Sequence, residues 1–530
     1  MPKIFINNNE IEANSNETII QAATRNGIDI PYFCWHPEMS VGGNCRMCLV
    51  EVGSPKRNPD GSFALDENNN PIINYMPKLQ IACNTMIMDG MRINTNTQKV
   101  MDARAAVMEF ILINHPLDCP ICDEAGQCKL QKYSEKYSNG GSRFTETKNQ
   151  SPKRIEWNDK IIYDSERCIS CSRCIRFTSE IMKEDVLTLI NRGDRVRIDR
   201  FDDAKIQNDY SMNVIDNCPV GALTSKDFRF KARVWEMSFN ESICTGCSRG
   251  CNIKIGSKSN QVLRVEPREN MQVNKYWMCD YGRLMMPSQI NDKRLNHPKV
   301  RINGILEEKS TWDVAISESI SLLKKHQPNE IYIIASALAS NESNHLVTEL
   351  AKKINTKNIG FIPRIDENFG DNFLKQNDKS PNQAGVKALG INTVNQSELI
   401  LKIISKEIKC ILALDEDFAY CENLVTVFPK LTSLIICSTK ENKAVKFSDV
   451  VFTVTECAEY EGSFTNCANI TQHFKSTMLF SEDLKSFEKL NSVNRSRLDI
   501  FGSHNDKWNL KAERDIKPSW YVLEKILKEF

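Results

Sequence analysis

The amino-terminal half of this chain concentrates side chains that bind soft metals. Fifteen of its twenty cysteines precede Asp280, and together with His115 they divide into four sets of four. Each set has its own spacing, and two of the four differ from common zinc signatures. Cysteine quartets with such varied spacing are typical of iron–sulfur clusters. The sequence therefore predicts four metal centres and a role in electron transfer.

The first set combines a close pair of cysteines with two distant ones. Its members are Cys34, Cys45, Cys48 and Cys83. A Cys-x2-Cys pair with a remote fourth cysteine is typical of plant-type [2Fe–2S] sites, although ten residues rather than four separate the first two ligands here. Residues 3–26 are predicted as a hairpin and a helix, a small β-grasp-like beginning. Residues 53–75 are predicted as a solvated loop.

The second set follows a predicted helix over residues 100–113 and includes a histidine. Its members are His115, Cys119, Cys122 and Cys128. A lone histidine at a helix end is more often a cap or a surface residue. The cysteine triplet otherwise lacks a fourth partner, so we interpret His115 as a ligand. A neutral imidazole in place of a thiolate makes a cluster less negative, which on its own raises its reduction potential.

The third and fourth sets each join a cysteine triplet to one remote cysteine. They are Cys168, Cys171, Cys174 and Cys218, and Cys244, Cys247, Cys251 and Cys279. Cys-x2-Cys-x2-Cys with a remote Cys-Pro is typical of [4Fe–4S] binding. Because this region has no second triplet, Cys218 is expected to close the same cluster. The fourth set also fits a [4Fe–4S] cluster, with zinc as the alternative.

The chain after residue 280 has the pattern of an α/β domain. Apolar runs predict strands over 330–339, 357–362 and 409–414, with parallel pairing. Ser340, Asn341 and Glu342 are predicted to cap a helix over 345–354. Residues 520–530 predict a helix whose apolar face docks on the body or on a partner. Five further cysteines have no ligand spacing and are interpreted as buried thiols. They are Cys410, Cys421, Cys437, Cys457 and Cys467.

The order of the four sets closely resembles the large iron–sulfur protein, the G subunit, of bacterial proton-pumping NADH:quinone oxidoreductase, respiratory complex I. The resemblance implies a [2Fe–2S] cluster on the Cys34 set and [4Fe–4S] clusters on the His115 and Cys168 sets, all on the route from flavin to quinone. It implies a fourth, off-route [4Fe–4S] cluster on the Cys244 set. Since mitochondrial relatives have lost those last cysteines, the chain is expected to be bacterial.

The resemblance implies a multidomain α+β and α/β chain of five domains. They are a β-grasp [2Fe–2S] ferredoxin-like domain (1–98), a helical His/Cys3 segment (99–145), a [4Fe–4S] ferredoxin-like domain (146–236), a molybdenum/tungsten-oxidoreductase-type [4Fe–4S] domain (237–295), and a shortened molybdopterin-oxidoreductase-like domain with a C-terminal helix (296–530). The last is too short for a full pterin-binding portion, so no molybdopterin is expected.

Donor and acceptor sites are expected on other subunits. No strand precedes a G-x-G-x-x-G loop and no phosphate loop is complete, so no catalytic residue is predicted. The resemblance implies three kinds of partner: a flavin-bearing NADH-oxidising subunit, its [2Fe–2S] companion, and quinone-side hydrophilic subunits.

The resemblance implies a peripheral location on the cytoplasmic face of the bacterial inner membrane. No run approaches the roughly 18 to 20 apolar residues of a membrane span, and no secretory signal is recognised. The 69 basic and 68 acidic residues give a net charge of +1, which supplies no field for nucleic acid.

Two alternatives stay open at this point. The catalytic subunit of an NAD-linked molybdopterin formate dehydrogenase shares the amino-terminal cluster arrangement, but such subunits usually carry further cysteine triplets and a full pterin domain. Bound molybdenum or tungsten would favour that interpretation. A zinc-stapled scaffold without redox function would be colourless, whereas an iron–sulfur protein is brown.

Overall fold

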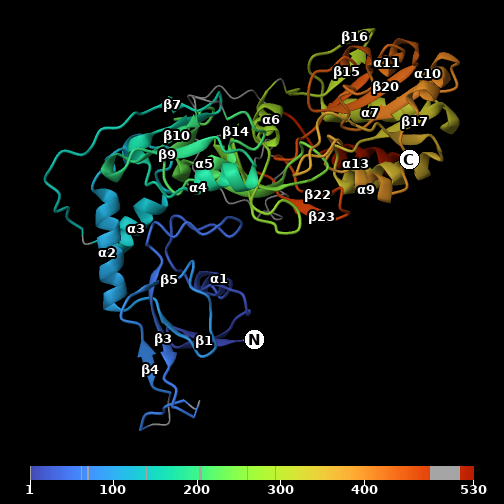
Figure 1. Ribbon diagram of the computed structural model, residues 1–530. Helices are drawn as coiled ribbons and strands as arrows, with labels where there is room; N and C mark the ends of the chain where they lie inside the picture. Colours follow the sequence, from blue (N-terminus) through green and yellow to red (C-terminus); the bar gives the residue numbers. More distant parts are fainter. Residues whose placement is uncertain are drawn as a thin grey trace. The chain divides into compact units, whose positions relative to one another are not determined.

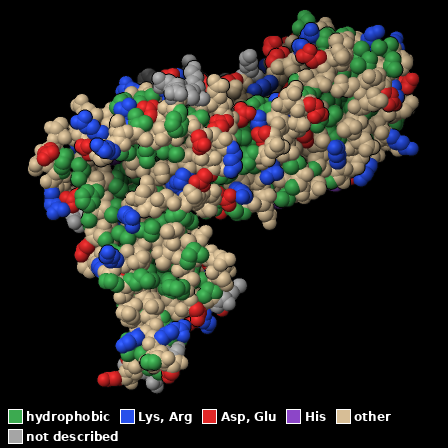
Figure 2. Space-filling view, in the orientation of Figure 1, with side chains coloured by type: hydrophobic (Ala, Val, Ile, Leu, Met, Phe, Trp, Pro, Cys, Tyr) green, Lys and Arg blue, Asp and Glu red, His purple; other side chains and the backbone are tan. Residues whose placement is uncertain are grey.

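The computed structural model describes residues 2–60, 63–67, 71–138, 140–201, 206–258, 261–292, 294–477 and 514–530. The chain forms two compact units, Met1–Val234 and Trp235–Phe530 (Figure 1). Among the described residues, no helix has both the length and the apolar character that crossing a bilayer requires. Lys and Arg side chains are interspersed with Asp and Glu over the visible face (Figure 2).

The first unit begins with a mixed sheet in the order β2-β1-β6-β3-β4, with β5 paired to β3. Its elements are β1 (Lys3–Ile6), β2 (Asn9–Glu12), α1 (Ile19–Arg25), β3 (Leu49–Pro55), β4 (Ile73–Tyr75), β5 (Gln80–Ile81) and β6 (Arg92–Asn94). The predicted hairpin and helix are confirmed, and Asn7 and Asn8 make the turn with positive φ. The solvated-loop prediction for 53–75 is wrong at both ends, because Gly53 pairs with Tyr75 between β3 and β4.

The rest of the first unit consists of one longer helix, α2, and several short elements. They are α2 (Gln98–Leu112), α3 (Lys129–Tyr137), β7 (Ile155–Glu156), β8 (Ile161–Tyr163), α4 (Arg173–Arg176), β9 (Leu187–Ile190), β10 (Arg197–Arg200), α5 (Asn213–Asn217) and β11 (Leu223–Ser225). The helix predicted over 100–113 is confirmed as α2. Its buried side chains include Val100 and Met108, while Phe110 is 75% exposed.

The second unit starts with a small layered region. It contains the antiparallel strands β12 (Ser238–Ile243), β13 (Asn252–Lys258) and β14 (Gln261–Pro267), the helix α6 (Asp280–Asn291), and the hairpin β22 (Gly462–Thr465) and β23 (Thr471–Phe474). Ile243, Phe464 and Phe474 are buried in one hydrophobic cluster. The late hairpin therefore packs on the early strands of this unit.

A seven-stranded sheet in the order β16-β15-β21-β20-β19-β17-β18 forms the main body of the second unit. Its strands are β15 (Lys299–Ile302), β16 (Ile305–Leu306), β17 (Ile331–Ala335), β18 (Ile359–Phe361), β19 (Cys410–Ala413), β20 (Ser433–Ser438) and β21 (Val450–Thr453). The predicted parallel pairing is confirmed for β17, β18 and β19. The strands β20 and β21 extend the parallel set, and β15 pairs antiparallel with β21.

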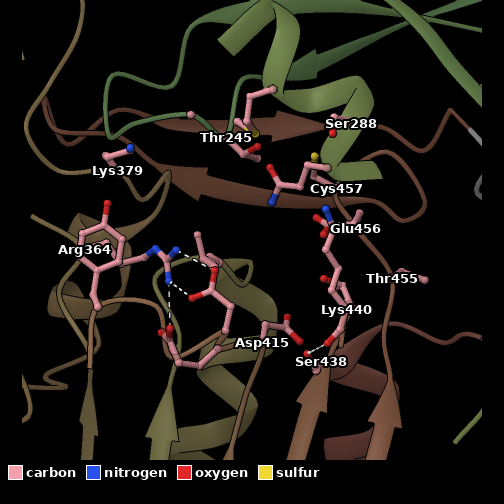
Figure 3. A pocket seen from close by; sticks show the side chains of 18 of the residues that line it. Thr245, Ser288, Arg364, Lys379, Asp415, Ser438, Lys440, Thr455, Glu456 and Cys457 are labelled. Atoms are coloured by element: carbon pink, nitrogen blue, oxygen red, sulfur yellow. Dashed lines mark hydrogen bonds and ion pairs between the residues drawn. The ribbon is translucent and has the colours of Figure 1, made fainter. Parts of the chain in front are cut away.

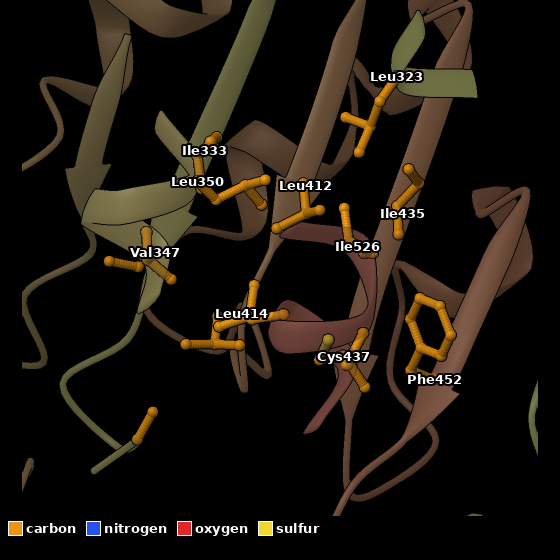
Figure 4. Close-up of a cluster of buried hydrophobic side chains, with 14 of the residues drawn as sticks. Leu323, Ile333, Val347, Leu350, Leu412, Leu414, Ile435, Cys437, Phe452 and Ile526 are labelled. Carbon is orange, nitrogen blue, oxygen red and sulfur yellow. The ribbon is translucent and has the colours of Figure 1, made fainter. Parts of the chain in front are cut away.

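Helices supply the apolar layers on both faces of this sheet. They are α7 (Trp312–Lys324), α8 (Asn341–Ile354), α9 (Gln383–Ala388), α10 (Gln396–Ile404), α11 (Glu422–Val425) and α13 (Ser519–Glu529). One cluster joins α7, α8 and α13 to the strands (Figure 4). A second cluster joins α10 and α11 to the other face. The predicted cap is confirmed, because Ser340 accepts a hydrogen bond from Ser343 N at the start of α8.

The remaining thiols and the last helix mostly follow expectation. Cys410, Cys421, Cys437 and Cys457 are buried, but Cys467 is exposed, so its predicted burial is wrong. Cys467 lies in the turn between β22 and β23, where the backbone reverses and the side chain has no layer to enter. The docking of the last helix on the body is confirmed, since Val522, Leu523 and Ile526 of α13 lie in the core of the main sheet.

Replacing Ile526 with alanine tests how much this docking contributes. Ile526 is fully buried against the sheet, so Ile526→Ala should lower the free energy of unfolding of this unit by about 2–5 kcal/mol. Leu401→Ala, in a helix of the same unit but 65% exposed, should change it by less than about 0.5 kcal/mol. Urea denaturation, with hydrogen exchange to assign the transition, measures both. Equal effects of the two variants would contradict the docking.

Candidate metal centres

The first set converges beside the amino-terminal sheet. The Cys45 and Cys83 thiols donate hydrogen bonds to Cys34 Sγ and lower its pKa, and a hydrogen bond from Cys83 lowers the pKa of Cys48. Cys34, Cys48 and Cys83 are buried and Cys45 is partly exposed. The thiolate is the form of cysteine that binds metal. The same hydrogen bonds raise the pKa of the two donors, Cys45 and Cys83. The four sulfurs of this set therefore lie together, as the ligands of one cluster must.

The third set surrounds a single small cavity. Its four cysteines line this cavity together with Tyr163, Ile198 and Leu223. Burial raises the pKa of Cys174 and Cys218 far above the ordinary thiol value, and the neighbouring sulfurs of the set raise each further. Four sulfurs in a dry space resist ionisation unless a positive core joins them. The donor set thus fits a cationic metal cluster.

The second set is held in part by the loop that carries Cys218. A Cβ added at Gly221 would lie 2.1 Å from Cys122 Sγ, so only glycine fits there. Cys128 Sγ lies 4.0 Å from the Pro219 carbonyl oxygen. Cys119 is exposed. The structure therefore brings two of the four predicted ligands against one glycine-containing loop.

The imidazole of His115 has the burial and the charge state that a neutral metal ligand needs. Within the described part of the chain, its Nδ1 is buried and has no hydrogen-bond partner. Burial, with the charges of Arg167 and Lys148, lowers the pKa of His115 to about 4. The ring is therefore uncharged at neutral pH and keeps a lone pair for a metal. The charged groups that act on it are Arg167, Lys148 and Asp118 rather than the three cysteines.

The fourth set lies wholly in the second unit, between β12, β13 and α6. Cys244 N donates to Cys251 O at 2.9 Å, which closes the loop of the triplet. Cys279 caps α6, and its Sγ accepts a hydrogen bond from Gly282 N at 3.4 Å. A Cβ at Gly282 would lie 2.6 Å from Cys244 Sγ and 3.7 Å from Cys279 Sγ. Burial raises the pKa of all four thiols, as in the third set.

Direct contacts connect the ligand loops of the first and third sets. The Arg176 guanidinium donates to the carbonyl oxygens of Cys34 and Ser40, and it lies 3.5 Å from the Cys171 carbonyl oxygen. Asn44 Nδ2 donates to Ser170 O at 3.0 Å. These hydrogen bonds hold a loop of each set at a fixed separation.

The third and second sets are joined through the loop at residues 218–221. Lys129 N, next to the predicted ligand Cys128, donates to Pro219 O at 3.1 Å. The side chain of Cys122 packs on Gly221 of the same loop. The contacts therefore run from the first set to the third and from the third to the second. Within the described residues, no group of three or more His, Cys, Asp or Glu side chains is arranged for a single metal ion.

Some contributing residues had no signal in the sequence. Gly282 stands in a helix, where glycine has no expected role, and its closeness to Cys244 depends on packing between distant segments. The Arg233 guanidinium donates to the carbonyl oxygens of Cys122 and Pro120 from more than 110 positions away. Arg176 is recognisable only as one of several basic residues near the third set.

Four family models match the chain, and each encloses one complete ligand set. They are the 2Fe-2S iron-sulfur cluster binding domain (2–98), the NADH-ubiquinone oxidoreductase-G iron-sulfur binding region (104–143), the NADH-quinone oxidoreductase subunit 3 ferredoxin-like domain (158–224) and the molybdopterin oxidoreductase Fe4S4 domain (237–291). The chain therefore contains 2Fe-2S and 4Fe-4S binding domains in the predicted order.

Curated relatives resemble this chain over more than two thirds of its length. The G subunit of NADH-quinone oxidoreductase from Rickettsia conorii is 37% identical over 71% of this chain and 53% of its own. Subunit 3 of the Thermus thermophilus enzyme is 37% identical over 69% of this chain and 48% of its own. A mitochondrial NADH dehydrogenase [ubiquinone] iron-sulfur protein 1 from Solanum tuberosum is 36% identical over 69% and 47%. The chain spans about half the length of these relatives.

The close approach of Gly282 to two sulfurs gives a test of the fourth centre. Alanine in a helix is favoured over glycine by about 1 kcal/mol, so Gly282→Ala would stabilise α6 if nothing touched the new methyl group. Because Cys244 Sγ is in the way, we expect the purified variant to lose about four iron atoms per chain, measured by iron assay. Gly141→Ala, where nothing lies within 4 Å, should keep all its iron. Full iron in Gly282→Ala would contradict the site.

Proposed function

Because the chain belongs to the family of the NADH-quinone oxidoreductase G subunit, we propose that it transfers electrons through protein-bound iron–sulfur clusters. The Cys34 set would hold a [2Fe–2S] cluster, and the His115, Cys168 and Cys244 sets would each hold a [4Fe–4S] cluster. Such clusters, when bound, supply one-electron transfer at potentials set by their ligands and surroundings. The protein positions and encloses them.

The main support for this proposal is the series of contacts that links the first three ligand sets. Electron tunnelling falls steeply with distance, so a conducting chain must hold successive centres close together. Arg176 and Asn44 link the Cys34 set to the Cys168 set, and the 218–221 loop links the Cys168 set to the His115 set. The proposed route therefore follows this spatial order, which differs from the order of the sets along the sequence.

The Cys244 set is proposed to lie off this route. Its four ligands belong to the second unit, whereas the other twelve belong to the first. They lie against a small antiparallel sheet and the capped helix α6, within a hydrophobic cluster. This position among buried side chains supports a structural role, in which the cluster stabilises the region around β12, β13 and α6.

The proposed setting is a bacterial NADH:quinone oxidoreductase complex. Electrons would enter from a flavin-bearing NADH-oxidising subunit and its [2Fe–2S] companion, and leave through quinone-side hydrophilic subunits. The chain would sit peripherally on the cytoplasmic face of the inner membrane. It would contribute no substrate site of its own.

Serine substitutions in the assembled complex test the assignment of on-route and off-route centres. We expect Cys174→Ser to remove one cluster signal in low-temperature EPR and to abolish NADH:quinone turnover, because the centre lies on the route. Cys244→Ser should remove a different signal and leave turnover intact. If turnover collapsed in Cys244→Ser while the complex stayed assembled, the off-route position would be wrong.

Arg176→Met tests the spatial order of the centres. The substitution removes the guanidinium that joins the loops of the Cys34 and Cys168 sets while keeping much of the side-chain bulk. We expect both EPR signals to persist, the Cys34 centre to be reduced by NADH at its usual rate, and the Cys168 centre to be reduced more slowly. Freeze-quench EPR resolves these steps. The exposed Arg192→Met is the matched control. Unchanged kinetics in Arg176→Met would contradict the proposed contact.

A further inference from the structure

The main sheet of the second unit has a topological switch point with a cavity beside it. From β17, the chain continues to β18 on one side and later to β19 on the other, so the connections diverge at the carboxyl ends of β17 and β19. Open parallel sheets bind ligands in the crevice at such a point. A cavity of about 400 Å³ lies there, which is within the size range of small-molecule sites (Figure 3). We call it the switch-point pocket.

The segments that follow four parallel strands form one wall of the switch-point pocket. They contribute Leu338 after β17, Asp415–Asp417 after β19, Ser438–Lys440 at the end of β20, and Thr455–Cys457 after β21. Thr245, Gly246 and side chains of α6 line the opposite side. All these residues belong to the second unit, and none is one of the sixteen predicted ligands.

The cations of the pocket already have anionic or aromatic neighbours. Arg364 makes ion pairs with Glu416 at 2.9 Å and with Asp417 at 2.6 Å. Lys379 lies 4.8 Å from the ring centroid of Tyr281. Lys440 and Glu456 act on each other electrostatically. An anionic ligand would therefore have to displace existing partners.

Asp415 differs from these groups because, among the described residues, it has no cationic neighbour. Its Oδ2 accepts a hydrogen bond from Ser519 Oγ at 2.9 Å. Within the described chain, its Oδ1 is buried and has no hydrogen-bond partner. Burial raises the pKa of Asp415 to about 7, and the only described charged side chain that acts on it is Glu456, which raises it further. Figure 3 shows Asp415 between the Arg364 side and the Ser438 side of the pocket.

Two more buried acceptors line the same space. Thr455 is 5% exposed, and its hydroxyl has no partner among the described residues. Glu416 is 1% exposed, and its Oε2 likewise has no partner in that part of the chain. Buried polar atoms without partners are costly, so a ligand that forms hydrogen bonds to them would be favoured. Burial raises the pKa of Glu416 to about 8, as it raises that of Asp415. A ligand that donates N–H bonds to these oxygens and places a positive charge opposite Asp415 would complete them.

We propose that the switch-point pocket binds a small organic cation of the guanidinium or amine class. Its N–H groups donate to Asp415 Oδ1, with Glu416 Oε2 and Thr455 Oγ1 as further acceptors. Its charge neutralises the Asp415 carboxylate, as no described side chain of the pocket does. A cavity of about 400 Å³ accommodates an organic molecule and is far larger than a bare metal ion requires.

A matched pair of probes tests this proposal on the full-length chain with its clusters in place. Butylguanidinium and butylurea have nearly the same shape, but only the first is charged. In isothermal titration calorimetry, butylguanidinium should bind with a Kd of about 1 mM or tighter, and butylurea about tenfold more weakly or not at all. The absence of saturable binding, or equal binding of both probes, would overturn the proposal.

Substitutions locate the site. Asp415→Asn keeps the shape and removes the charge, and should weaken butylguanidinium binding at least about tenfold. Glu422→Gln, an exposed carboxylate outside the pocket, should leave it unchanged. Should Asp415→Asn fail to fold, Thr455→Val still tests the pocket, with a several-fold loss expected. Undiminished binding in the folded variants would overturn the location. Because the titration involves no electron transfer, its failure leaves the proposed electron-transfer function untouched.

Discussion

Around the Cys168 set, the first unit keeps thiol sulfurs together in a space that water does not enter. Cys174 and Cys218 illustrate the constraint, because burial and neighbouring sulfurs both oppose their ionisation. Only a positive core makes such a cluster of thiolates favourable. The loop that carries the Cys168 triplet turns tightly, and Ser170 and Ser172 adopt positive φ there. The helix that carries Cys174, α4, is only four residues long.

The second unit meets a different requirement in most of its volume. Its parallel strands are buried on both faces between two apolar clusters, which is the usual arrangement for such sheets. Stability there comes from packing that needs no metal. The predicted ligands of this unit lie where β12, β13 and α6 meet. Gly282 has no room for a side chain there, because Cys244 Sγ lies against it. The two units therefore differ in what holds them together as well as in their folds.

Local sequence patterns predicted many of the helices and strands but few of the contacts between them. Apolar runs located β17 and β19, and Ser340 marked the start of α8, because these signals act within a few residues. The same periodicity did not show that Phe110 points outward or that Gly53 pairs with Tyr75, since both depend on what packs against them. The prediction that Cys467 is buried was wrong for the same reason. Its exposure results from its position in a hairpin turn and not from the apolar nature of its side chain.

The spacing of cysteines predicted which residues belong together but could not predict how the sets adjoin. The His115 set lies between the first and third sets in sequence, yet the contacts place the third set in the middle. The reason is Cys218, which returns to the Cys168 triplet from forty-four residues away. The residues after it then face the second set, with Pro219 O against Lys129 and Gly221 against Cys122. One short loop thus contacts both sets of predicted ligands. It carries the predicted ligand Cys218, and its Gly221 has no room for a side chain because Cys122 lies against it.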